Sequence, residues 1–225
     1  MRILIAAAFL AAVSFVDVRA QETPAPAPAP AAEEEEVMPA PVEVTVQTAE
    51  IAAMLENAPF VHKGNGGTAL YLIEFRSCPT CLELKADQYD RMNALGIDMR
   101  FIMYARADRE GKPRSKPGER AMIAELWMNR DFAQWERWYA VDPDTFYETE
   151  TLPPSADDDP ARMALVEQSR QIVRDLAAIL EANGVEMAIP ALFWQHDGKW
   201  MTYIGYDKAV FESLILPQLA PASAQ

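Results

Sequence analysis

The first half of the chain alternates between helix-like and strand-like patterns of hydrophobic residues. Residues 48–58 (TAEIAAMLENA) place apolar side chains at helical spacing, with Thr48 as a candidate N-cap. Residues 60–75 contain two strand-like runs around a glycine-rich turn, and the second run is almost continuously apolar, which is typical of a buried central strand. Helical spacing returns over 82–95, and residues 97–105 then predict another strand.

The second half is mainly helical and ends with a pair of strands and a short helix. Residues 117–141 show mixed helical spacing with several aromatic side chains, which indicates packing. After a turn-rich interruption, residues 160–183 carry an apolar stripe typical of a long amphipathic helix. Residues 185–206 predict two strands joined by a turn at Asp197-Gly198, and Asp207 is the expected N-cap of a closing helix.

The first twenty residues (MRILIAAAFLAAVSFVDVRA) have a different pattern. A positive start at Arg2 precedes an apolar run shorter than the roughly 20 residues that a membrane-spanning helix needs. Val18 and Ala20 then occupy the small-residue positions of a signal-peptidase site. We expect a signal peptide, residues 1–20, cleaved after Ala20, with an uncleaved anchor helix as the alternative. Export of this kind places the protein in the periplasm, outside the reducing cytosol.

Residues 21–42 have a composition that cannot form a core. Alternating Pro and Ala favour an extended polyproline conformation, and the consecutive glutamates 33–36 repel one another, which predicts a disordered spacer. Residues 43–225 are then predicted to form one domain, for which a hydrophobic content of 50% is ample. The net charge of −14 argues against nucleic acid and anionic membrane surfaces as partners, which leaves proteins or small molecules.

The two cysteines of the chain, Cys78 and Cys81, lie in the motif SCPTC between a predicted buried strand and a predicted helix. Pro79 suits the first helical turn because its missing N–H is not needed there. Free amide groups and the positive end of the helix dipole stabilise a thiolate at the first cysteine, so Cys78 is the expected nucleophile. Cys81, one turn later, can resolve a mixed disulfide by attacking Cys78.

Three other interpretations of the cysteine pair remain open. A structural disulfide across two residues closes too small a loop to stabilise the fold much. A zinc site needs four ligands, and His62 and His196 lack ligand spacing to the cysteines. Cu(I) suits Cys and Met ligands, and the chain has 11 Met, but these fall at core-like positions where gap filling is the commoner role. We therefore predict no metal.

Three segments, LYLIEFRSCPTCLEL, AMIAELWMNRDFAQWERW and LEANGVEMAIPALFWQHDGKWMTYIGY, resemble thioredoxin-fold thiol–disulfide oxidoreductases of the bacterial periplasm, in particular the catalytic domains of the DsbC/DsbG type. The resemblance covers Val42 to Leu219. It implies an α/β protein with a thioredoxin-like fold and a helical insertion, near residues 110–185, between the CxxC half and a hairpin led by a cis-proline. It also implies an enzyme that acts on client proteins carrying thiols or disulfides. No cofactor beyond the redox-active Cys78–Cys81 disulfide is expected, and a membrane redox partner is compatible with this activity.

The resemblance also assigns roles to single residues. Cys78 matches the family's nucleophile and Cys81 its resolving thiol. Pro190 matches the cis-proline that faces the motif, and Ile189 matches the residue whose backbone pairs with an incoming peptide; a trans proline at a strand start is the alternative for Pro190. The isomerases of the family usually have Thr before this proline, so Ile189 favours a reductase. They also have a dimerisation domain where this chain has only the spacer, so we expect a monomer.

Two neighbours of the motif are candidates for tuning the thiols. Glu74 could act as a proton relay, or simply face water. Arg76 could stabilise the thiolate by its charge, or be exposed at the surface. The sequence thus predicts an exported thiol–disulfide oxidoreductase. The alternative is a non-catalytic module with the same fold that carries Cu(I) or assembles a cell-envelope complex.

Overall fold

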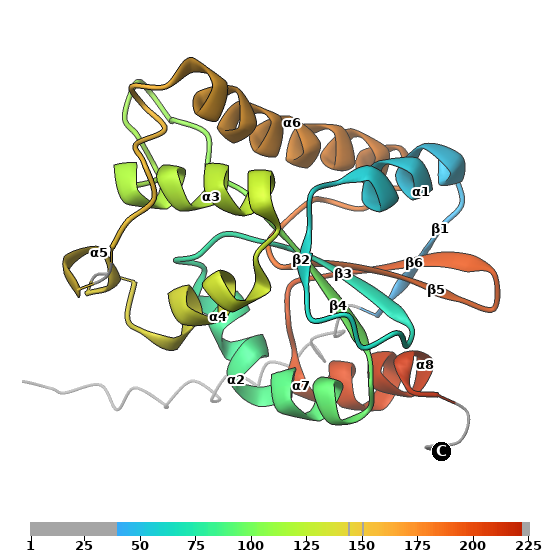
Figure 1. Cartoon of the computed structure of the whole chain (residues 1–225). Helices are drawn as coiled ribbons and strands as arrows, with labels where there is room; N and C mark the ends of the chain where they lie inside the picture. The colour runs from blue at the N-terminus through green and yellow to red at the C-terminus, as the bar shows by residue number, and fades with distance from the viewer. Residues whose placement is uncertain (1–39, 144, 150, 222–225) are drawn as a thin grey trace, which may run out of the picture. The chain divides into compact units, whose positions relative to one another are not determined.

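A six-stranded mixed sheet forms the centre of the domain, in the strand order β1-β6-β5-β3-β4-β2 (Figure 1). The computed structural model describes residues 40–143, 145–149 and 151–221. The predicted signal peptide, its cleavage site and most of the predicted spacer therefore lie outside the described residues. The strands are β1 Val42–Val44, β2 Val61–His62, β3 Ala69–Glu74, β4 Asp98–Met103, β5 Ala191–His196 and β6 Lys199–Ile204. Strand β1 thus begins at Val42, the last residue of the predicted spacer.

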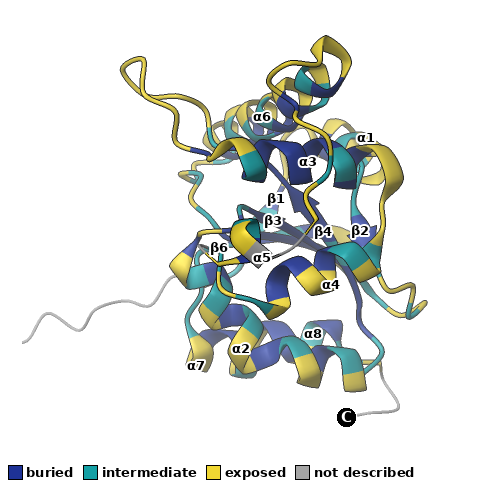
Figure 2. Cartoon of the chain, turned by 60° about the vertical axis from the view of Figure 1, so that its left-hand side comes forward, coloured by how far each residue is buried: buried dark blue, intermediate teal, exposed yellow. Residues whose placement is uncertain are grey.

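Helices cover both faces of this sheet. They are α1 Thr48–Asn57, α2 Pro79–Ala94, α3 Pro117–Asn129, α4 Phe132–Ala140, α5 Phe146–Thr149, α6 Pro160–Ala182, α7 Lys208–Val210, the π-helix η1 Phe211–Ile215 and α8 Leu216–Leu219. Figures 1 and 2 show α1, α3 and α6 on one face and α2, α7 and α8 on the other, with the strands largely buried between the two layers. Within the described residues, no helix is both long and apolar enough to cross a membrane.

The strand pairing defines the fold class. Strand β3 is parallel to β4 and antiparallel to β5, and β5 pairs with β6 as a hairpin. Helix α2 connects β3 to β4, and the helical segment α7 to α8 follows β6. This β-α-β unit followed by a β-β-α unit is the arrangement of a thioredoxin-like fold, which confirms the predicted fold class. Helices α3 to α6 lie between β4 and β5, where the helical insertion was predicted.

Strands β2 and β3 flank the glycine-rich turn, but they do not pair with each other. Both edges of β3 are occupied by β4 and β5, so β2 pairs antiparallel with the outer edge of β4 instead. Helix α4 packs at this side of the sheet, where the ring of Trp135 stacks on Phe101 of β4 with 4.1 Å between the ring centres. Trp135 and Trp138 are fully buried, as expected for packing residues.

The predictions of the Asp197-Gly198 turn and of the Asp207 N-cap are confirmed, whereas the prediction of Thr48 as an N-cap is wrong. Asp197 and Gly198 have φ values of 50° and 74°, both in the left-handed region that a two-residue hairpin turn requires. Asp207 caps α7 by accepting a hydrogen bond from the backbone N–H of Val210. Thr48 is not an N-cap: it is the first residue inside α1, and Gln47 precedes the helix without a side-chain cap.

Candidate active site

The two cysteines form a disulfide at the N-terminus of α2, with their Cα atoms 5.2 Å apart. Cys78 is the N-cap of this helix, and its Sγ accepts a hydrogen bond from the backbone N–H of Cys81 at 3.1 Å. Pro79 occupies the first helical turn. The sulfur of Cys78 therefore lies where the unpaired amides and the helix dipole favour negative charge. Cys78 and Cys81 are 2% and 0% exposed, whereas Ser77 and Pro79 beside them are exposed.

The segment that leads into β5 lies against this disulfide. The peptide bond between Ile189 and Pro190 is cis, and Pro190 is buried. The carbonyl oxygen of Ile189 lies 3.8 Å from the Sγ of Cys78. The sheet explains this contact, because Ile73 near the end of β3 is opposite Ala191 at the start of antiparallel β5. The residues that follow β3 and those that precede β5 consequently meet at one edge.

Glu74, the last residue of β3, is buried and does not face water. It is 2% exposed, and its Oε2 accepts a hydrogen bond from the hydroxyl of Tyr139 at 3.1 Å. Burial raises the pKa of Glu74 to about 7, against the opposing effects of the Tyr139 hydrogen bond and of the charges on Lys85 and Arg76. A carboxyl group with this pKa can both hold and release a proton near neutral pH.

Arg76 is also buried, at 2% exposed, and is held against the end of α4. Its Nε donates to the carbonyl of Trp138 at 3.1 Å, and its Nη2 donates to the carbonyl of Val141. The guanidinium lies over the ring of Tyr139, 4.6 Å from its centre. Within the described residues, neither Arg76 nor Glu74 has a hydrogen bond or ion pair to a cysteine, and their tuning of the thiols stays a prediction.

The half-buried Lys85 and the buried Tyr139, neither of them predicted from the sequence, lie against Glu74 and Arg76. The Nζ of Lys85 lies 4.6 Å from the ring centre of Tyr139, and burial lowers the pKa of Lys85 to about 8. Tyr139 is buried, and its burial raises its pKa well above the ordinary value. Lys85 follows Cys81 by four residues on the same helix, which places both on one side of α2 and could have been seen in the sequence. Nothing local marks Tyr139, because its partner Glu74 is 65 residues away.

The residues considered for metal binding lie elsewhere in the fold. His62 belongs to β2, where its Nδ1 is 2.9 Å from a carboxylate oxygen of Asp98. Of the methionines that the sequence places at core-like positions, Met92 and Met122 are indeed buried in the core. In the part of the chain that the structure describes, no three His, Cys, Asp or Glu side chains gather as a metal site would require.

Comparisons with known proteins give matches only among solved structures. No protein-family model matches the sequence, and no curated protein matches it. A periplasmic thioredoxin-like protein from Salmonella enterica serovar Typhimurium is 14% identical, covers 76% of this chain and 96% of its own, and has a TM-score of 0.43. The catalytic domain of Proteus mirabilis ScsC is 12% identical over 76% of this chain and 96% of its own, with a TM-score of 0.44. Oxidised BdbD from Bacillus subtilis is 14% identical, covers 73% of this chain and 94% of its own, and has a TM-score of 0.42.

The resemblance to the DsbC/DsbG type in particular stays a prediction. The fold itself is assigned from the topology of this chain and from the position of its disulfide. The β3–α2–β4 unit, the β5–β6 hairpin and the position of the cysteines are all observed directly. The described chain is therefore a thioredoxin-like α/β domain whose CxxC disulfide begins α2 and faces a cis-proline segment.

Proposed function

We propose that this chain is an exported thiol–disulfide oxidoreductase that acts on client proteins and works mainly as a reductase. The observation that carries the proposal is the Cys78–Cys81 disulfide at the start of α2, with the Sγ of Cys78 3.8 Å from the carbonyl oxygen of Ile189. A disulfide across two residues adds little stability to a fold, because the loop it closes is short. The same position favours a thiolate, which is the reactive form of cysteine.

The reaction begins with both cysteines reduced. The Cys78 thiolate attacks one sulfur of a client disulfide, the client S–S bond breaks, and the second client sulfur leaves as a thiolate that takes up a proton. Cys81 then loses its proton and attacks the Sγ of Cys78, which releases the first client sulfur as a thiol. The client gains two electrons and two protons, and the protein is left with the Cys78–Cys81 disulfide seen in the structure.

Glu74 is the proposed proton relay for the second step. The deprotonation of Cys81 needs a base whose pKa is near the working pH, and burial holds the pKa of Glu74 at about 7. Tyr139 donates a hydrogen bond to this carboxyl group and fixes its orientation. Arg76 contributes a fixed positive charge near the end of β3 and is the second proposed tuning residue.

Ile189 and Pro190 are the proposed docking position for the client peptide. Within the described residues, the backbone N–H of Ile189 makes no backbone hydrogen bond, and its carbonyl points to the Cys78 sulfur at 3.8 Å. An extended client segment can pair with such a backbone edge as an added strand. The preference for reduction rests on the residue before the cis-proline, because Ile189 at this position is more typical of thioredoxin-like reductases than of the isomerases, which usually have Thr there.

The proposal extends to compartment and assembly. The signal-like first twenty residues support export to the periplasm, where a membrane redox partner would return the disulfide to two thiols. The net charge of −14 disfavours nucleic acid as a partner.

We expect the mature protein to be a monomer. Light scattering at moderate salt would measure its mass in solution. A stable dimer would contradict the expectation and favour an isomerase.

Reduction of insulin by dithiothreitol tests the activity. The wild-type protein should accelerate the reduction, and Cys78→Ser should lose the acceleration because no nucleophile remains. Cys81→Ser is the matched variant: it keeps the nucleophile and should accumulate mixed disulfides that non-reducing electrophoresis detects. Equal rates for wild type and Cys78→Ser, with stoichiometric copper retained on purification, would overturn the proposal in favour of the Cu(I)-carrying module.

A further inference from the structure

A pocket of about 190 Å³ opens beside the CxxC motif, and four of its described lining residues are cationic. Ser77, the residue directly before Cys78, forms part of its wall. Its cationic residues come from the end of β3 and from the segment between β4 and α3: Arg76, Arg106, Arg114 and Lys116. An otherwise acidic protein thus gathers positive charge next to its reactive disulfide.

Two of these arginines have hydrogen-bonding capacity to spare. The Nη1 of Arg76 and the Nε of Arg106 are both buried, and neither makes a hydrogen bond to another described residue. Arg106 is also held in place, because its Nη2 donates to the hydroxyl of Ser77 at 3.1 Å and its guanidinium lies 4.5 Å from the ring centre of Phe75. Buried N–H groups without a partner are costly, so these two groups keep the guanidinium ions in an environment that favours a nearby negative charge.

Among the described residues, Glu119 is the acidic member of the pocket lining. Glu119 is 4% exposed, and its Oε1 has no hydrogen-bond partner within the described residues. Burial raises the pKa of Glu119, against the lowering effect of Arg106. Arg114, in contrast, is exposed at the rim. The described lining thus contains four cationic residues and one buried carboxyl group.

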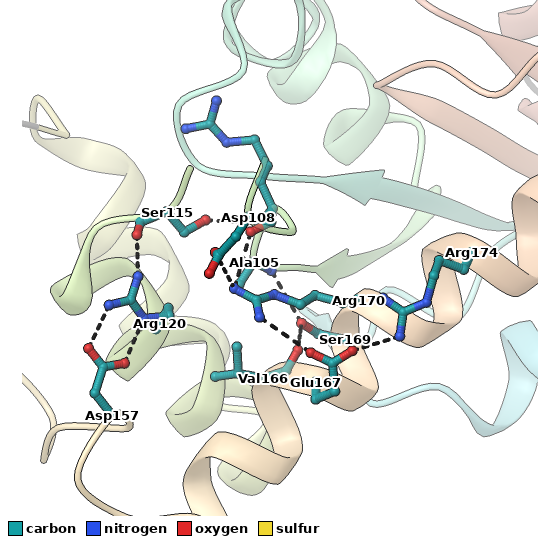
Figure 3. Close-up of polar contacts among 11 residues, drawn as sticks. Ala105, Asp108, Ser115, Arg120, Asp157, Val166, Glu167, Ser169, Arg170 and Arg174 are labelled. Carbon is teal, nitrogen blue, oxygen red and sulfur yellow. Dashed lines mark hydrogen bonds and ion pairs between the residues drawn. The ribbon is translucent and has the colours of Figure 1, made fainter. Parts of the chain in front are cut away.

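The segment that carries Arg106 is held rigidly by the polar network of Figure 3. The backbone N–H of Ala105 donates to Ser169 of α6 at 3.2 Å, and that of Arg106 donates to Ser115 at 2.9 Å. Arg170 of α6 donates to the carbonyl of Arg106 and pairs with Asp108, both at 3.3 Å. The backbone that carries Arg106 is therefore held in place before any ligand arrives, which reduces the entropy lost on binding.

A second part of this network, also in Figure 3, anchors the same segment to α3. Arg120 pairs with both carboxylate oxygens of Asp157, at 2.6 and 2.5 Å, and also donates to the carbonyl of Ser115. The segment is thus tied at both ends, to α6 and to α3. This arrangement anchors the segment that supplies Arg106 and Arg114 to the pocket lining.

We propose that this pocket binds a carboxylate side chain of the client, located a few residues from the client cysteine, and so selects acidic segments as substrates. The proposal rests on the thiol–disulfide exchange proposed above. Arginine binds carboxylates through charge-assisted hydrogen bonds, and Arg76, Arg106 and Arg114 all line this pocket. Because the chain carries a net charge of −14, an acidic segment is repelled elsewhere on the molecule, and the pocket gives it one orientation.

Three short peptides that differ in charge test this selection. Each contains one cysteine as a mixed disulfide with 2-thiopyridine, flanked by Glu, Gln or Lys residues. Attack of the Cys78 thiolate on the peptide sulfur breaks the S–S bond and releases pyridine-2-thione, whose absorbance gives the rate constant. We expect the Glu peptide to react about three- to tenfold faster than the Gln peptide at low ionic strength, and the Lys peptide to be slowest. The difference should shrink in about 0.5 M NaCl.

Two matched variants locate the effect. Arg114→Gln removes a cation from the rim and should lower the ratio of the Glu and Gln rates toward one. Arg109→Gln makes the same charge change at an exposed residue of the same segment, outside the pocket lining, and should keep the wild-type ratio. A wild-type ratio of one or less, or equal losses in both variants, would overturn the proposal. If no peptide reacts faster with wild type than with Cys78→Ser, exchange itself fails, and client selection fails with it.

Discussion

The Sγ of Cys78 lies 3.8 Å from the carbonyl oxygen of Ile189, although the two residues are 111 positions apart in the chain. The contact exists because β3 and β5 are antiparallel neighbours, so the residues after one strand meet those before the other. It brings the proposed nucleophile and the proposed client-docking backbone to one place.

The reactivity of the two thiols should differ strongly after reduction. Cys78 caps α2 and accepts the N–H of Cys81, while Cys81 is 0% exposed inside the first helical turn. We expect Cys78 to be alkylated by iodoacetamide at least about tenfold faster than Cys81 at neutral pH. Mass spectrometry of peptides after timed quenching measures both rates. Faster labelling of Cys81 would reverse the assigned roles.

Glu74 should make the stability of the fold depend on pH. Its folded pKa of about 7 exceeds its ordinary value of 4.5, so between these values the folded state keeps a proton that the unfolded state releases. The free energy of unfolding should therefore fall as pH rises from about 4.5 to about 7. Glu74→Gln should remove this part of the pH dependence, which amounts to up to about 3 kcal/mol.

Urea unfolding of the oxidised protein at pH 5 and pH 8 measures this effect. The exposed Glu83, on the outer side of α2, provides the matched control, because Glu83→Gln removes the same charge from a solvated position and should keep the wild-type profile. A Glu74→Gln profile that parallels the wild type would show that the carboxyl group is not buried in solution.

Trp135 should be a principal packing residue between α4 and the sheet. It is fully buried and stacks on Phe101 at 4.1 Å and on Phe132 at 5.3 Å between ring centres. Trp135→Ala should lower the free energy of unfolding by about 3–5 kcal/mol, and Trp135→Phe by clearly less because part of the stacking remains. Chemical denaturation of the three proteins compares them. Equal losses in both variants would argue against the stacking contribution.

Gly118 should be required by the close approach of Tyr147 to α3. A Cβ at this position would lie 2.5 Å from a ring carbon of Tyr147, so Gly118→Ala should destabilise the fold by about 1–3 kcal/mol. In a Tyr147→Ala background the same substitution should instead stabilise by about 0.5–1 kcal/mol, since alanine favours a helix over glycine. A double-mutant cycle in urea measures the change of sign. The same effect in both backgrounds would place the ring elsewhere.

Several features follow from the sequence alone because they depend on neighbours in the chain. Hydrophobic periodicity identified the buried strand before the CxxC motif and the long helix after Pro160. The Asp197-Gly198 turn and the Asp207 cap depend on backbone preferences of a few adjacent residues. The placement of Cys78 at the start of a helix needs only the apolar run before it and the helical spacing after it. Thr48 shows the limit of such signals, because the helix begins one residue earlier than a capping threonine requires.

Only the tertiary structure decided which distant groups meet. Glu74 and Arg76 are charged residues close to the exposed Ser77 in the chain. They are buried because α4 packs against them and supplies the Tyr139 hydroxyl and the carbonyl of Trp138 from more than 60 positions away. The cationic pocket likewise needs the segment between β4 and α3 to be anchored by α6. Burial and pairing of this kind depend on strand order and helix packing over long separations, which local propensity and periodicity do not encode.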